Sequence, residues 1–187
     1  MSKAYDRVNV FTLAAALARL RLPPAFTQTI LRLFLPRFNQ VFTAYGNSDT
    51  YLVHSGIDQG EVIFPLLWCI YYDPLLCAIN DSPYRFVSEV EWCPNVRLPV
   101  TDNFWLKIPA LVYMDDTLWL AKSKEDLIKI TEIANSFFAF NDIQVNWSKS
   151  ELLVNIPQLQ PFEINYDNNT WSINAHSPKD SVRYLGV

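Results

Sequence analysis

Two adjacent carboxylates, Asp115 and Asp116, stand between two short apolar runs, residues 109–112 and 118–121. An apolar run, a charged pair and a second apolar run predict a β-hairpin whose turn presents both carboxylates together. Two like charges this close are costly unless a cation neutralises them, and Mg²⁺ is typically bound through one or two carboxylates plus substrate phosphates. The pair is therefore a candidate metal site. Because Asp is also a common turn residue, a plain surface turn is the more frequent explanation of such a pair taken alone.

A segment with two glycines lies upstream of the carboxylates. Residues 56–67 read Gly-Ile-Asp-Gln-Gly-Glu-Val-Ile-Phe-Pro-Leu-Leu and lead into a long apolar run. Glycine tolerates positive φ and lets another backbone approach closely, which suits a loop that passes beside another strand. A turn that merely opens a helix explains Gly56 and Gly60 equally well on local evidence.

Together, these two patterns resemble the reverse transcriptase family. Residues 56–67 look like motif B of that family, and residues 113–116, Tyr-Met-Asp-Asp, look like its motif C, in the family's order. Residues 2–8, Ser-Lys-Ala-Tyr-Asp-Arg-Val, are similar to the tail of motif A in polymerases of non-LTR retrotransposons. Residues 146–151 look like motif D, and residues 184–186 look like the start of motif E. The resemblance covers essentially the whole chain.

The resemblance implies an α+β fold. This is a polymerase palm in which an antiparallel sheet packs on helices, with fingers and thumb largely missing. Residues 1–187 would form one partial palm domain that begins inside motif A and ends in motif E. With 50% hydrophobic and 14% aromatic residues, the chain can bury the core of one sizeable domain.

Periodicity and capping residues predict the local elements. Asp6 or Asn9 is expected to cap the first helix and Ser123 the last. Residues 46–49, Gly-Asn-Ser-Asp, are expected to form a hairpin turn, and residues 80–103 form a polar, proline-bearing region without an assigned element. The expected helices are 9–22, 25–35, 62–79 and 123–140, the expected strands are 40–45, 50–54, 143–145 and 152–156, and 166–171 is a second expected hairpin turn.

For function, the resemblance implies an RNA-directed DNA polymerase that uses two-metal nucleotidyl transfer. Asp115 and Asp116 would be its catalytic and metal-binding residues, with Mg²⁺ or Mn²⁺ as the cofactor. Tyr5 would lie beneath the sugar and favour deoxynucleotides through a clash with a 2′ hydroxyl, although a core tyrosine is the commoner local role. Lys149 would approach the leaving pyrophosphate, with a solvated surface lysine as the commoner alternative. The other implied site residues are Gln59, Gly60, Pro65, Tyr113 and Met114 for nucleotide and template binding, and Tyr184, Leu185 and Gly186 for the primer-grip region.

The implied partners are an RNA template, a DNA primer and deoxynucleoside triphosphates. Two departures favour instead a non-catalytic remnant or a nucleic-acid-binding module. The family's motif A aspartate sits immediately before the position of Met1, and Phe64 stands where a small Ser is usual. They lead to the expectation that residues 1–187 alone show no primer extension. A maturase-like relative would use the same motifs, but the Ser-Lys-Ala-Tyr-Asp segment favours the retrotransposon branch.

The charge of the chain is unfavourable for nucleic-acid binding. With 15 basic and 19 acidic residues the net charge is −4, whereas phosphate contacts draw on Lys and Arg. We therefore expect weak binding by this chain itself.

Cysteine use and hydropathy indicate the compartment. Cys69, Cys77 and Cys93 match no Cys-x-x-Cys zinc spacing, and we expect reduced thiols without disulfide partners inside the cell, in nucleus or cytoplasm. The apolar run 62–79 contains prolines and Asp73, which predicts a buried helix and no membrane span, and no signal segment is visible.

Overall fold

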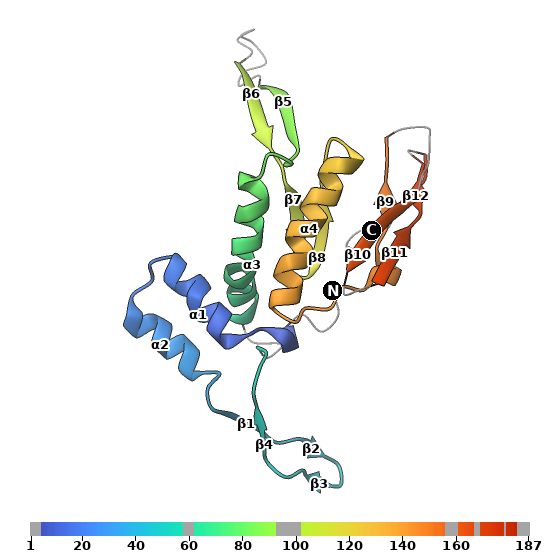
Figure 1. Ribbon diagram of the computed structural model, residues 1–187. Helices are drawn as coiled ribbons and strands as arrows, with labels where there is room; N and C mark the ends of the chain where they lie inside the picture. Colours follow the sequence, from blue (N-terminus) through green and yellow to red (C-terminus); the bar gives the residue numbers. More distant parts are fainter. Residues whose placement is uncertain are drawn as a thin grey trace. The chain divides into compact units, whose positions relative to one another are not determined.

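The computed structural model describes residues 5–57, 62–92, 102–155, 161–166, 169–177 and 179–182. These residues form four α-helices and short strands that pair two by two (Figure 1). The fold therefore mixes helices with small, mainly antiparallel sheets. The described strands do not join into one continuous sheet. The chain forms two compact units, Met1–Pro74 with Phe140–Gln144 (unit 1) and Leu75–Ala139 with Val145–Val187 (unit 2).

Unit 1 begins with a 3₁₀ turn, η1 (Tyr5–Arg7), and two short helices, α1 (Val10–Arg19) and α2 (Pro24–Arg32), which lie side by side (Figure 1). The predicted cap Asn9 is confirmed: its side-chain oxygen accepts hydrogen bonds from two backbone N–H groups of the first turn of α1, at 2.9 and 3.2 Å. Arg21 adopts a left-handed φ of +56° just after α1, so the helix stops short of the expected residue 22.

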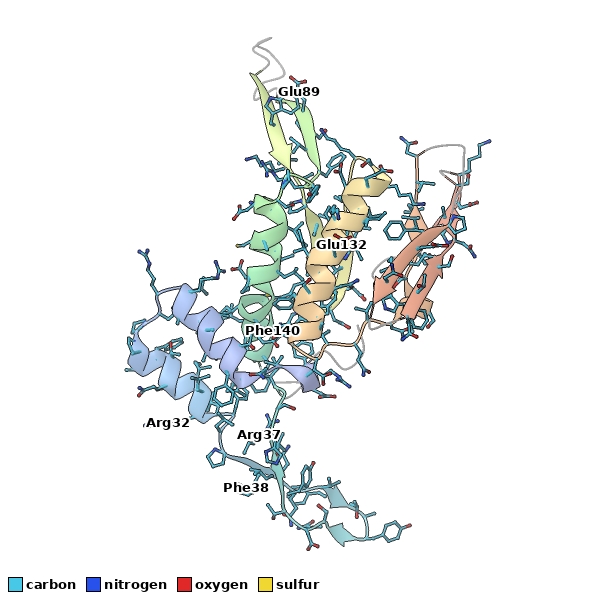
Figure 2. All side chains as sticks on the ribbon, in the orientation of Figure 1. Arg32, Arg37, Phe38, Glu89, Glu132 and Phe140 are labelled. Atoms are coloured by element: carbon cyan, nitrogen blue, oxygen red, sulfur yellow. The ribbon has the colours of Figure 1, made fainter. Side chains whose placement is uncertain are left out.

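A hairpin arm follows α2. Strand β1 (Arg37–Asn39) pairs with β4 (Tyr51–Val53), and β2 (Phe42–Thr43) pairs with β3 (Gly46–Asn47), all antiparallel. The chain therefore reverses at residues 44–45. The exposed aromatic side chains of this arm are Phe38, which Figure 2 labels, and Phe42, Tyr45 and Tyr51.

The turn expected at residues 46–49 is wrong. The Thr43 hydroxyl donates a 2.7 Å hydrogen bond to the Gly46 carbonyl and so closes a tighter turn two residues earlier. Ser48 and Val41 form two hydrogen bonds with each other. The Ser48 N–H donates to the Val41 carbonyl at 2.9 Å, and the Val41 N–H donates to the Ser48 hydroxyl at 3.0 Å. These side-chain bonds to the backbone outweigh the general turn preference of Gly-Asn-Ser-Asp.

Helix α3 (Phe64–Asp81) confirms the helix predicted at residues 62–79 and contains Pro74. Among the described residues, no helix has the length and apolar character needed to cross a bilayer. The Trp68 side chain of α3 is buried, and its ring lies 5.4 Å from Tyr5, 5.9 Å from Tyr71 and 5.4 Å from Tyr72, measured between ring centroids. This aromatic cluster forms part of the unit 1 core. Further buried apolar residues of unit 1 include Val8, Leu13, Leu17, Ile30, Phe34, Ile57 and Leu67.

Phe64 belongs to this core. Its side chain is 6% exposed, and its ring centroid lies 5.6 Å from that of Phe34. The ring that departs from the family's usual Ser is therefore accommodated by packing, with an aromatic partner that accounts for its size.

We predict that Phe64→Ser lowers the free energy of unfolding by about 3–5 kcal/mol, because the substitution removes a buried ring and leaves a cavity. Leu66→Ser, two residues along the same helix at a side chain 59% exposed, is the matched control and should cost far less. Urea unfolding of both variants measures the difference. Equal losses would show that Phe64 is not a core residue.

Unit 2 contains strand pairs and helix α4 (Lys124–Phe140), whose last residue falls in unit 1. The predicted cap is confirmed, since the Ser123 hydroxyl accepts from the Asp126 N–H at 3.1 Å. Three strand pairs are antiparallel: β5 (Val87–Trp92) with β6 (Asp102–Lys107), β7 (Ala110–Tyr113) with β8 (Asp116–Trp119), and β10 (Phe162–Tyr166) with β11 (Asn169–Ile173). A fourth pair, β9 (Leu152–Leu153) with β12 (Ala175–His176), is parallel. A 3₁₀ turn, η2, spans Trp147–Lys149.

Three strand predictions can be compared with the structure: two in unit 2 and one at residues 143–145. Tyr166 pairs with Asn169, which confirms the hairpin predicted at 166–171. The β5–β6 pair lies within residues 80–107, where no strand was expected. Residues 143–145 form no strand beyond a single bridge at Gln144, and their place in the fold is fixed instead by the fully buried Ile143.

Candidate active site at the β7–β8 hairpin

The predicted carboxylate hairpin is confirmed. Tyr113 pairs with Asp116, so the chain reverses through two residues, Met114 and Asp115 (Figure 1). Met114 has φ +55°, the sign that the favoured two-residue hairpin turns require at their first central position. Gly or Asn adopts this conformation most readily, so Met114 holds a strained backbone, and such strain is concentrated at functional sites.

The pairing decides which face each side chain takes. Residues directly opposite in an antiparallel pair share a face, so Tyr113 lies with Asp116 and Leu111 lies with Leu118 on one side of the hairpin. Tyr113 is 61% exposed and Leu111 is also exposed, which makes this the open face. Asp116 is exposed on that face, and Asp115 is half-buried in the turn. The hairpin thus presents one carboxylate to solvent beside an open aromatic ring.

The donor set fits a hard divalent cation bound in an incomplete protein cage. Two neighbouring carboxylates at an accessible turn can hold Mg²⁺ if waters or substrate phosphates fill the remaining positions. Among the described residues, no group of three His, Cys, Asp or Glu side chains is placed to hold a metal ion. Asp115 and Asp116 would therefore bind a cation together with a second ligand source.

In unit 1, Gly56 makes a close backbone contact with the segment that contains Asp6. The Gly56 N–H donates to the Val8 carbonyl at 2.9 Å, and the Ile57 N–H donates to the Tyr5 carbonyl at 2.8 Å. Gly56 has φ +89°, and a Cβ atom built on it would lie 2.8 Å from both the Cα and the carbonyl oxygen of Asp6. Gly56 therefore makes a close backbone approach to the chain's own segment 5–8.

We predict that Gly56→Ala destabilises the protein more than Gly46→Ala. Both glycines have positive φ, so each substitution carries about 1–3 kcal/mol of backbone strain. Only Gly56 adds a steric clash, because a Cβ at Gly46 would meet nothing within 4 Å. Thermal unfolding of the two variants measures the gap, and equal shifts in Tm would contradict the tight contact with Asp6.

Comparison of the sequence with known proteins identifies the family. Residues 1–187 match the family model described as reverse transcriptase (RNA-dependent DNA polymerase). The chain belongs to this reverse transcriptase family. A curated relative, the retrovirus-related Pol polyprotein from type-1 retrotransposable element R2 of Popillia japonica, is 24% identical over 194 aligned residues. The alignment covers 98% of this chain and 25% of that relative, so the chain spans about a quarter of the relative's length.

Within this reverse transcriptase domain, the remaining site predictions fall in different places. Tyr5 is half-buried with its ring against Trp68, which is the packing of a core tyrosine. Pro65 is half-buried in the first turn of α3, and Lys149 is exposed in η2. The motif B residues Gln59 and Gly60 and the motif E residues Tyr184, Leu185 and Gly186 lie outside the described residues.

Two of the three cysteines lie in the part of the chain that the structure describes. Cys69 is an exposed free thiol and Cys77 is half-buried, while Cys93 lies outside the described residues.

Sequence reasoning missed a polar network beside motif A. The Tyr71 hydroxyl donates to the Asn141 side-chain oxygen at 2.7 Å and accepts from the Asn9 N–H at 3.3 Å. Next to Asn141, Asp142 pairs with Arg7. The Asn-Asp pair directly after the helix predicted at 123–140 was the available signal, because such residues favour helix C-termini and left-handed φ. Its partners could not be read from the sequence.

Burial raises the pKa of Tyr71 to about 12, from an ordinary value of 10, against the smaller lowering by the Asn9 N–H. The unfolded chain loses this proton near pH 10 and the folded chain only near pH 12. The contribution of the protonated Tyr71 to the unfolding free energy is therefore fully present below pH 10 and is lost as the pH rises toward 12, at up to about 1.4 kcal/mol per pH unit.

We predict that the unfolding free energy falls more steeply between pH 10 and 11.5 in the wild type than in Tyr71→Phe, which has no such proton. Urea unfolding at a series of pH values measures both slopes. Parallel slopes for the two proteins would contradict a buried, neutral Tyr71.

Proposed function

We propose that this chain forms the palm part of an RNA-directed DNA polymerase and that Asp115 and Asp116 of motif C are its catalytic carboxylates. The observation that carries the proposal is the two-residue turn of the β7–β8 hairpin, which places Asp115 in the turn and Asp116 directly after it on the open face. Family membership supports the reaction class. The partners would be an RNA template, a DNA primer and deoxynucleoside triphosphates, substrates found inside the cell.

In the proposed reaction, the primer 3′ oxygen attacks the α-phosphorus of the incoming nucleotide and pyrophosphate leaves. Asp115 and Asp116 would hold Mg²⁺ or Mn²⁺, which when bound stabilises negative charge on the attacking and leaving oxygens. Asp116 is exposed and can meet a ligand that arrives from solvent. Tyr113 offers its exposed ring on the same face as Asp116 and would limit where the substrate can approach.

Tyr5 would select the sugar. The Ile57 N–H donates to its carbonyl and Trp68 lies against its ring, and both contacts limit how far Tyr5 can yield to a 2′ hydroxyl. Lys149, exposed on η2, would assist the leaving pyrophosphate by its positive charge. Gln59, Gly60 and Pro65 of motif B would line the nucleotide and template pocket.

Phe64 does not favour a decayed polymerase. The packing of its ring against Phe34 gives this residue a structural role in the core. This packing weakens Phe64 as an argument for the remnant alternative, and the polymerase assignment is the one we pursue.

The activity test uses a longer chain, in which residues 1–187 follow a segment that supplies the family's motif A aspartate and the fingers. We predict Mg²⁺-dependent primer extension on an RNA template, and a loss on the order of 100-fold or more with Asp115→Asn, because a charged group that stabilises the transition state is removed. Asp49→Asn, at an exposed loop position of the hairpin arm, is the control and should retain activity.

Metal binding has a readout that does not depend on activity. In residues 1–187, Mn²⁺ should selectively broaden NMR signals of residues 113–117, and the double variant Asp115→Asn, Asp116→Asn should abolish this. Broadening elsewhere only, or full extension by the Asp115→Asn enzyme, would refute the proposed site.

A further inference from the structure

Asp142 stands just after a helix and has a left-handed backbone conformation. Helix α4 ends at Phe140, and Asp142, two residues later, has φ +52°. Helices commonly end with a residue in this left-handed conformation, and Gly is by far the easiest choice because it has no Cβ. An Asp here holds backbone strain that a Gly would relieve.

The side chain of Asp142 is engaged with motif A. Arg7 Nη1 lies 2.6 Å from Asp142 Oδ2, and the same nitrogen donates to the Asp142 carbonyl at 2.8 Å. The Asp142 side chain is 87% exposed, whereas that of Arg7 is 27% exposed. Ion pairs this exposed contribute little to folding stability. The contribution of this ion pair to stability is therefore small, and its main consequence is where it holds Arg7.

The neighbouring residue holds the same segment from inside. Asn141 is buried and accepts from the Tyr71 hydroxyl, which in turn accepts from the Asn9 N–H. The turn at residues 141–142 thus reaches the chain on both sides of the buried Val8, at Arg7 directly and at Asn9 through Tyr71. On the N-terminal side, Arg7 belongs to the same η1 turn as Tyr5.

We propose that Asp142 is a positioning residue for motif A. Through Arg7 it fixes the η1 turn, and with it Tyr5, in the orientation that excludes ribonucleotides. The inference rests on the proposed polymerase function and on Tyr5 as the sugar-selecting residue. It adds a specificity determinant that lies 135 positions along the chain from Arg7 and does not touch the substrate.

The substitution Asp142→Gly separates this role from stability. It keeps the carbonyl that accepts from Arg7, removes the carboxylate and relieves the left-handed strain. We expect Tm to stay level or rise while discrimination between deoxynucleotides and ribonucleotides, measured as the ratio of kcat/KM values, falls at least 5-fold. If Asp142 had a merely structural role, a variant of unchanged stability would keep its discrimination between the two nucleotide classes.

Arg21→Gly is the matched control. Arg21 also follows a helix, α1, with φ +56°, and its N–H closes the helix end onto the Ala18 carbonyl. Its replacement relieves the same strain away from motif A and should leave discrimination unchanged. Arg7→Gln should reproduce the effect of Asp142→Gly, and the double variant should lose no more than either single one, since both act through one interaction.

A second readout needs no polymerase activity. In residues 1–187, contacts between the Tyr5 and Trp68 rings are observable as nuclear Overhauser effects, and Asp142→Gly should weaken them while Arg21→Gly does not. An active enzyme whose selectivity survives Asp142→Gly overturns this inference and leaves the polymerase assignment intact. Absence of extension by the wild-type longer chain overturns the polymerase assignment itself, while weakened ring contacts in Asp142→Gly would still support the positional part.

Discussion

The backbone contact between Gly56 and Asp6 organises much of unit 1. It joins segments 50 positions apart, and it is possible only because one partner carries no side chain and tolerates a φ of +89°. Two backbone hydrogen bonds, from Gly56 and Ile57, set the registration of the segments. With η1 held there, the half-buried Tyr5 ring packs against Trp68 of α3. In this reverse transcriptase domain, the contact joins the start of the segment that resembles motif B to the segment that resembles the tail of motif A.

Features that depend on a few neighbouring residues could be predicted from the sequence. The caps Asn9 and Ser123, helix α3 and the β7–β8 hairpin all arise from short patterns whose physical cause is local. The arm turn was predicted wrongly because one hydroxyl, that of Thr43, outweighs a general preference for Gly-Asn-Ser-Asp turns. The β5–β6 pair was missed because residues 93–101 separate its two strands, so their pairing does not follow from one local pattern.

In the candidate site, too, local features could be predicted and features that depend on distant partners could not. Asp115 and Asp116 are adjacent in sequence, so their place at one hairpin follows from a local pattern, whereas the positive φ of Met114 could not be read from its residue type. The turn at Asn141 and Asp142 was beyond sequence reasoning, because its meaning comes from partners in η1 and α3. Asn141 and Asp142 contact residues far away in the sequence, so no pattern of neighbouring residues marks these contacts.

The β1–β4 arm has a consequence for handling the protein. Two-stranded ribbons leave backbone groups on their outer edges, and this one also exposes Phe38, Phe42 and Tyr45. Edges with apolar side chains are templates for pairing between molecules. The colloidal behaviour of the isolated chain will therefore depend on this short arm more than on its well-packed helices, and polar replacements at the arm's exposed rings are a rational first step toward concentrated samples.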